Sequence, residues 1–104
     1  MERMTDEEFD GSMFERDVPV VIAFTGLFCS RCKAMKQSYD EIEKTMEGRA
    51  RFVEICMDEN HAVGDRFGVT DMPTLAICIN GECQTVFNGF APLAVLVDTI
   101  DLFC

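Results

Sequence analysis

The sequence predicts an α/β fold, in which a mixed β-sheet lies between two layers of helices. Three observations indicate this three-layer α/β/α sandwich. The run Val18 to Thr25 is apolar at nearly every position, as expected of a strand in a sheet that is covered on both faces. Strand-like and helix-like segments alternate along the first two thirds of the chain, which favours parallel strands joined by helices. Near the end, two strand-like segments flank Asn80-Gly81, a pair typical of a tight antiparallel hairpin.

The first half of the chain is predicted to contain two helices and two strands. Thr5 or Asp6 can cap a short helix that runs through Phe9 to Phe14. The strand Val18 to Thr25 follows it. A long helix is expected from about Ser30 to Met46, and Gly48 follows its end. The apolar stripe of this helix is formed by Met35, Tyr39, Ile42 and Met46. A second central strand is expected over Arg51 to Asp58.

The second half is predicted to begin with a short helix over Asn60 to Phe67. The hairpin then consists of Thr74 to Ile79, the turn Asn80-Gly81 and Glu82 to Phe87. Pro92 suits the first turn of a final helix, whose apolar face is formed by Leu93, Leu96, Val97 and Ile100.

Length and charge limit the function classes. A chain of 104 residues has room for one ordinary domain, over 1–104. Nineteen acidic and nine basic side chains give a net charge of −10, which disfavours nucleic acid and anionic membrane surfaces as partners. No apolar run is long enough to span a bilayer, and the start of the chain has no basic segment followed by an apolar one, so we expect a cytoplasmic protein.

Six cysteines in such a chain raise the question of disulfide scaffold, metal site or redox site. Cys29 and Cys32 form one close pair, whereas Cys56 and Cys78 lie in apolar runs where a reduced thiol behaves as a small hydrophobic residue. In a chain without an export signal, a close pair indicates redox or metal chemistry before it indicates a structural disulfide.

The Cys29-Ser30-Arg31-Cys32 motif falls where the first strong strand gives way to the long helix. A cysteine at the N-terminal end of a helix faces unpaired backbone N–H groups and the positive end of the helix dipole, which lower its pKa from about 8.5. Cys32, one turn later, is close enough to attack a mixed disulfide on Cys29. Spacing and placement therefore predict a nucleophilic thiol and a resolving thiol.

Two alternatives concern the remaining cysteines. Cys78 and Cys83 would complete a four-thiolate metal site together with the first pair, but the hairpin places them opposite each other on neighbouring strands. There they are either packed thiols, which we favour, or a strained and reducible disulfide. Cys104 is expected to be exposed and His61 to be solvated, with no metal set around it.

The motif and several other features together resemble the thioredoxin family, over essentially the whole chain from Met4. The matching segments are Val20 to Phe24, Phe28-Cys29-x-x-Cys32-Lys33, the acidic turn Asp58-Glu59-Asn60, the stretch Phe67 to Thr74 that ends in the family's cis-proline, the turn Asn80-Gly81, and Gly89.

The resemblance implies a thioredoxin-like fold and a thiol–disulfide oxidoreductase without a bound cofactor or metal. Cys29 would attack a protein disulfide and Cys32 would release the product, until a recycling reductase, for which thioredoxin reductase is the family's example, restores both thiols. Substrate would contact Phe28, Ser30 and Arg31 on one side and Met72, Pro73 and Gly89 on the other. We expect a monomer acting as a reductase in the cytoplasm, although oxidants and isomerases use the same two cysteines.

This chain departs from the family pattern around the motif. Phe28 and Thr25 stand where the family has tryptophan, Ser30-Arg31 replaces Gly-Pro, and Gln37 replaces a proline that kinks the helix. The cation at Arg31 should favour the Cys29 thiolate and make the couple more oxidising than the family's reductases.

The family's buried aspartate and its lysine partner correspond to Ala23 and Glu54. Glu54 could move the Cys32 proton if its side chain faces that thiol and burial raises its pKa, or water carries the proton instead. The rival function for the whole chain is a thioredoxin-fold binding or metal-holding module whose thiols do not turn over.

Overall fold

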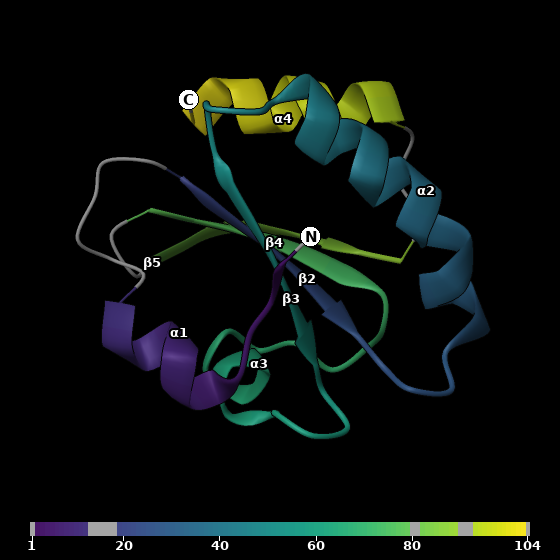
Figure 1. Cartoon of the computed structure of the whole chain (residues 1–104), viewed down its shortest axis with the longest axis vertical. Coiled ribbons are helices and arrows are strands. Elements are labelled where there is room, and N and C mark those ends of the chain that lie inside the picture. The colour runs from purple at the N-terminus through teal and green to yellow at the C-terminus, as the bar shows by residue number, and fades with distance from the viewer. Residues whose placement is uncertain (1, 13–18, 80–81, 90–92, 104) are drawn as a thin grey trace.

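The computed structural model describes residues 2–12, 19–79, 82–89 and 93–103, and it contains a five-stranded sheet with four helices (Figure 1). In chain order the elements are β1 (Glu2–Arg3), α1 (Asp6–Ser12), β2 (Val20–Thr25), α2 (Ser30–Thr45), β3 (Arg51–Cys56), α3 (Ala62–Arg66), β4 (Thr74–Ile79), β5 (Glu82–Asn88) and α4 (Leu93–Phe103).

The sheet is mixed, as predicted. Its strand order is β1-β3-β2-β4-β5, with β2 in the centre. β3 runs parallel to β2 and to β1, whereas β4 runs antiparallel to both β2 and β5. All six residues of β2 are buried, because helices cover both faces of the sheet at this strand.

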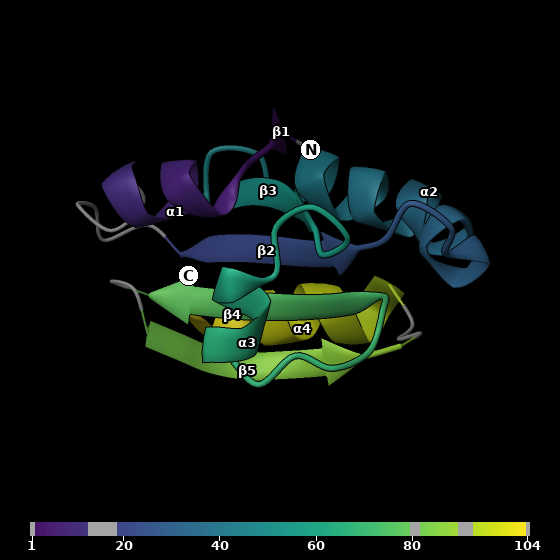
Figure 2. The same ribbon diagram turned by 90° about the horizontal axis from the view of Figure 1, so that it is seen from below.

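The helices form the two outer layers. α2 and α4 lie on one face of the sheet, and α1 and α3 lie on the other (Figures 1 and 2). The predicted stripe on α2 is confirmed, since Met35, Tyr39, Ile42 and Met46 are all buried, and they pack together with Leu96 and Ile100 of α4. The opposite face has its own core, centred on Phe9, Ile22, Phe24 and Ile55. The three-layer architecture is therefore confirmed.

Element boundaries differ from the predictions at a few ends. β3 ends at Cys56 and not at Asp58, and α3 is shorter than the predicted Asn60 to Phe67. β1 was not predicted, because two exposed polar residues carry no periodic pattern and acquire strand structure only by pairing with Val53 and Glu54. The positions of Phe14, Val18, the turn Asn80-Gly81, Pro92 and Cys104 lie outside the described residues.

The two candidate caps of α1 have different roles. The Glu8 N–H donates to Thr5 Oγ1 at 3.1 Å, and the Thr5 N–H donates to Glu8 Oε1 at 3.2 Å, which is the reciprocal arrangement of a capping box. Thr5 is therefore the cap. The Asp6 carboxylate instead accepts hydrogen bonds from the N–H groups of Ala62 and Val63 at 3.0 and 3.2 Å, and so it joins α1 to the start of α3.

Within the described part of the chain, no helix has the length and apolar character that crossing a membrane requires.

Candidate active site

The Cys-x-x-Cys motif lies at the junction of the central strand and the longest helix, as predicted. β2 ends at Thr25, α2 begins at Ser30, and Cys29 is the residue that caps the helix. Cys29 and Cys32 form a disulfide, with their Cα atoms 5.2 Å apart. The strand-to-helix junction thus holds both sulfur atoms in one place.

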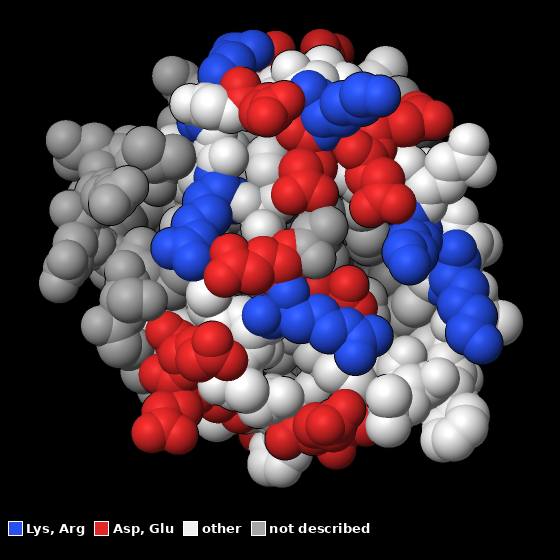
Figure 3. Space-filling model, viewed as in Figure 1, with Lys and Arg blue, Asp and Glu red and all other residues white. Residues whose placement is uncertain are grey.

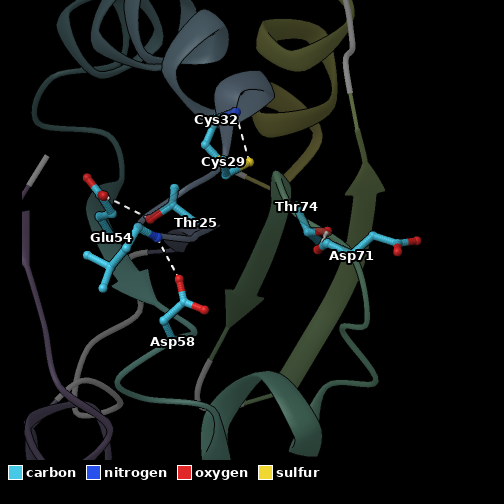
Figure 4. The surroundings of a disulfide bond; sticks show 8 residues. Thr25, Cys29, Cys32, Glu54, Asp58, Asp71 and Thr74 are labelled. Atoms are coloured by element: carbon cyan, nitrogen blue, oxygen red, sulfur yellow. Dashed lines mark hydrogen bonds between the residues drawn. A yellow bond between two sulfur atoms is a disulfide. The ribbon is translucent and has the colours of Figure 1, made fainter.

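The start of α2 also holds the two cysteines in different environments. The Cys32 N–H donates to Cys29 Sγ at 3.1 Å (Figure 4), and the Lys33 N–H donates to the Cys29 carbonyl at 3.2 Å. A backbone N–H directed at a sulfur stabilises a thiolate there. Cys29 is half-buried, whereas only 6% of Cys32 is exposed, so Cys29 is the more accessible residue of the pair.

The loop before the motif is held by two contacts that were not predicted from the sequence. The Leu27 N–H donates to Asp58 Oδ2 at 2.6 Å, and this bond ties the loop to the turn that follows β3 (Figure 4). Gly26 leaves room for the side chain of Met72, because a Cβ atom at Gly26 would lie 2.7 Å from Met72 Sδ. The acidic turn was visible in the sequence, but its contact with the loop depends on the packing of β3 beside β2.

The residues predicted to contact substrate belong to two segments, one at the motif and one around Pro73 and Gly89. Phe28 is 98% exposed, and Ser30 and Arg31 are also exposed. Met72 is half-buried, and the Met72–Pro73 peptide bond is cis. Gly89 donates its N–H to the Pro73 carbonyl at 2.8 Å and has a φ of +73°, a conformation that favours glycine.

A cavity of about 420 Å³ lies behind the disulfide, and both Cys32 and Glu54 line it. Thr25 Oγ1 donates to Glu54 Oε2 at 2.9 Å (Figure 4), and Arg3 Nη2 lies 4.0 Å from the same oxygen. The Glu54 side chain is 24% exposed. The two small residues Thr25 and Gly26 border this cavity, at the end of the strand that carries the motif.

Tyr39 of α2 borders the same cavity. It is 4% exposed, and its hydroxyl has no hydrogen-bond partner among the described residues. Burial raises the pKa of Tyr39 to about 12, so the group is a neutral hydroxyl at physiological pH.

The other described cysteines are free thiols. Cys78 and Cys83 face each other in the β4–β5 ladder, as predicted, and they are not joined by a disulfide. Burial raises the pKa of Cys78 to about 12, with a further contribution from the nearby Cys83, and burial also raises the pKa of Cys83. Cys56 is buried, as predicted for a core residue.

Metal binding finds little support in the described residues. Among residues 2–12, 19–79, 82–89 and 93–103, no group of three or more potential ligands is suited to hold a metal ion. His61 is exposed, and its Nδ1 lies 3.6 Å from Oδ2 of Asp65, which is also exposed.

Comparisons with known proteins agree with this geometry. A family model described as Thioredoxin matches residues 1–102. Thioredoxin 1 of Nostoc sp. is 30% identical over 99 residues, which cover 95% of this chain and 92% of that protein. Thioredoxin of Rickettsia felis is 30% identical over 98 residues, which cover 94% and 93% of the two chains. Thioredoxin M4, chloroplastic, of Arabidopsis thaliana is 30% identical over 100 residues, which cover 96% of this chain and 52% of that protein.

Proposed function

The chain belongs to the thioredoxin family of protein-disulfide oxidoreductases, and we propose that it reduces protein disulfides with Cys29 as the nucleophile and Cys32 as the resolving thiol. That it is a thiol–disulfide oxidoreductase follows from its family and from the Cys29–Cys32 pair. The observation that carries the assignment of roles is the position of Cys29 at the start of α2, where the Cys32 N–H donates to its sulfur at 3.1 Å.

The proposed cycle consists of two exchange steps. The Cys29 thiolate attacks one sulfur of the substrate disulfide, the substrate S–S bond breaks, and the departing thiolate takes up a proton. Cys32 then loses its proton and attacks the Cys29 sulfur, which releases the second substrate thiol and forms the Cys29–Cys32 disulfide. Two electrons pass from the protein to the substrate. A recycling dithiol reductase, of the thioredoxin reductase kind, returns two electrons and two protons.

Substrate is proposed to lie across the exposed rim of the site. Phe28 would pack against apolar side chains of the substrate, and Ser30 and Arg31 would contact it beside Cys29. On the other side, the backbone of Met72 would pair with an extended segment of substrate, next to Pro73 and Gly89. The exposure of Phe28 supports this assignment, because an aromatic ring that is 98% exposed gains most by being covered on binding.

Glu54 is proposed to accept the Cys32 proton. Its support is the shared cavity and the Thr25 hydroxyl, which holds one carboxylate oxygen at 2.9 Å. Glu54→Gln should therefore change the pH dependence of the second exchange step, whereas Asp40→Asn, which removes another carboxylate lining the cavity, should not. Rapid-mixing kinetics between pH 5 and pH 9 provide the measurement. An unchanged pH profile in Glu54→Gln would mean that water, and not Glu54, accepts the Cys32 proton.

We place the protein in the cytoplasm as a monomer of one domain over 1–104, and we expect no bound cofactor. The balance of nineteen acidic to nine basic residues supports a soluble partner in preference to nucleic acid or a membrane surface.

Insulin-disulfide reduction with dithiothreitol tests the proposed function. The native protein should accelerate reduction, Cys29→Ser should lose at least about a hundredfold of that rate, and Cys83→Ser should keep it. The rival reading, a binding or metal-holding module, predicts no acceleration by the native protein and a stoichiometric metal in elemental analysis.

A further inference from the structure

A third of the basic residues of this acidic chain lie in or just after the Cys-x-x-Cys motif. Arg31, Lys33 and Lys36 supply three of the nine basic residues within six positions, on a chain whose net charge is −10. All three are exposed. Figure 3 shows basic side chains over the first turns of α2, next to an uncharged surface at the loop that precedes the helix. We call Arg31, Lys33 and Lys36 the cationic patch. Arg31 lies between the two cysteines in the sequence, and Lys33 and Lys36 line the cavity that Cys32 also lines.

Folding does not account for the cationic patch. The first turn of a helix favours negative charge, and α1 follows this rule with Asp6, Glu7 and Glu8. The first turn of α2 contains no acidic residue. Among the ion pairs of the described residues, none includes Arg31, Lys33 or Lys36. The three cations are thus unfavourable for the start of the helix, and no ion pair within the described residues offsets this effect.

Three of the acidic groups near the motif are directed towards other parts of the protein. The Asp58 carboxylate accepts a hydrogen bond from the Leu27 N–H, and Figure 4 shows the Asp71 carboxylate pointing away from the two cysteines. Glu54 is held by Thr25 behind the disulfide. Asp40, the second of the two acidic residues that line the cavity, is exposed and has no ion pair within the described residues. A substrate at Cys29 can therefore pair with Arg31, Lys33 or Lys36 without first breaking an ion pair within the described residues.

Screening makes this local charge decisive. At physiological ionic strength the Debye length is about 8 Å, so acidic residues on the far side of the domain have little effect on a docked peptide. Charges within a few ångströms of the reacting sulfur still act on the docked peptide. The remaining negative surface then excludes acidic molecules elsewhere, which confines the attraction to the active site.

We propose that the cationic patch selects substrates whose disulfide is flanked by acidic residues, with an apolar residue placed against Phe28. This inference rests on the proposed function and adds a substrate class to it. The exchange chemistry is unchanged, since the patch acts on the encounter and on the mixed disulfide through charge alone.

Three synthetic peptide disulfides of equal length test the proposal, with two Glu, two Gln or two Lys beside the disulfide. Each rate with the protein is divided by the rate with dithiothreitol, which corrects for the intrinsic reactivity of each peptide. At physiological ionic strength the corrected kcat/KM should be about tenfold higher for the Glu peptide than for the Lys peptide. At 1 M salt the ratio should approach one.

Substitutions attribute the preference to the patch. The triple variant Arg31→Gln, Lys33→Gln, Lys36→Gln should bring the ratio to about one or below, and Lys36→Gln alone should lower it part of the way. Lys44→Gln, at the other end of α2, is the matched control and should keep the native ratio. A native ratio near one, or a native ratio retained in the triple variant, overturns the proposal. Reduction of the Gln peptide separates the two hypotheses: if it is reduced while the ratio is flat, only the selection fails, and if it is not reduced, the proposed function fails as well.

Discussion

The described residues contain two pairs of neighbouring cysteines, Cys29 with Cys32 and Cys78 with Cys83, and the surroundings of the two pairs differ. Cys29 and Cys32 lie at the N-terminal end of a helix of 16 residues, and Cys29 is accessible. Cys78 and Cys83 lie on two antiparallel strands, and Cys78 is fully buried. The first pair forms a disulfide and the second does not. Backbone N–H groups stabilise a thiolate at the first pair, whereas burial opposes one at the second. Proximity of two sulfur atoms is thus insufficient for redox function.

The largest expected difference between the pairs is in alkylation rate. The reduced protein should react with iodoacetamide at Cys29 about a thousandfold or more faster than at Cys78 at pH 7, because a thiol whose pKa is raised to about 12 contains almost no thiolate there. Peptide mapping after timed quenching gives both rates. Comparable labelling of the two residues in the folded protein would remove the distinction between the pairs.

Alkaline pH should destabilise the protein through two buried groups, the Cys78 thiol and the Tyr39 hydroxyl. The raised pKa values of Cys78 and Tyr39 mean that both groups keep their protons longer in the folded than in the unfolded protein. Their contribution to stability is full below about pH 9 and is lost as the pH rises towards 12, by about 1.4 kcal/mol per pH unit for each titrating group. Urea unfolding of the oxidised protein, in which Cys29 and Cys32 do not titrate, measures the free energy of unfolding at each pH.

Variants assign this alkaline loss to its sources. Cys78→Ala and Tyr39→Phe should each flatten the fall in the free energy of unfolding above pH 9 relative to the native protein. Cys56→Ala is the control at another buried thiol. If both variants follow the native pH dependence, the buried thiol and hydroxyl are not the groups responsible.

The smallest expected effect concerns Arg31. Loss of this cation in Arg31→Gln should make the Cys29–Cys32 couple more reducing by about 10 to 20 mV, as expected for an exposed charge worth less than about 1 kcal/mol. Lys44→Gln should leave the potential unchanged. Equilibration with glutathione buffers provides the measurement, and a shift towards a more oxidising couple in Arg31→Gln would contradict the stabilisation of the Cys29 thiolate.

The elements that the sequence predicts well are those whose pattern is local. The apolar run of β2 and the stripe of Met35, Tyr39, Ile42 and Met46 are confirmed because burial on a regular element imposes a period on the sequence. β1 was missed because it exists only through its pairing with β3.

At the active site too, features with a local sequence pattern are predicted, whereas contacts between distant segments are not. Cys29 and Cys32 are recognisable from their spacing and their place between a strand and a helix. The contacts of Asp58 with Leu27 and of Met72 with Gly26 join segments far apart in the chain, so no local pattern reveals them. Tyr39 was predicted only as part of the apolar stripe. No local pattern indicates the cavity beside it, or that its hydroxyl has no hydrogen-bond partner among the described residues.

A redox titration with quantitative thiol mapping tests the central claim most directly. The protein is equilibrated over a series of dithiothreitol redox buffers, quenched in acid, alkylated after unfolding and mapped by mass spectrometry. Cys29 and Cys32 should be oxidised together in one two-electron transition, while Cys78 and Cys83 remain thiols throughout. A Cys78–Cys83 disulfide that forms in the same range of potentials, or a Cys29–Cys32 pair that stays reduced, would contradict the account.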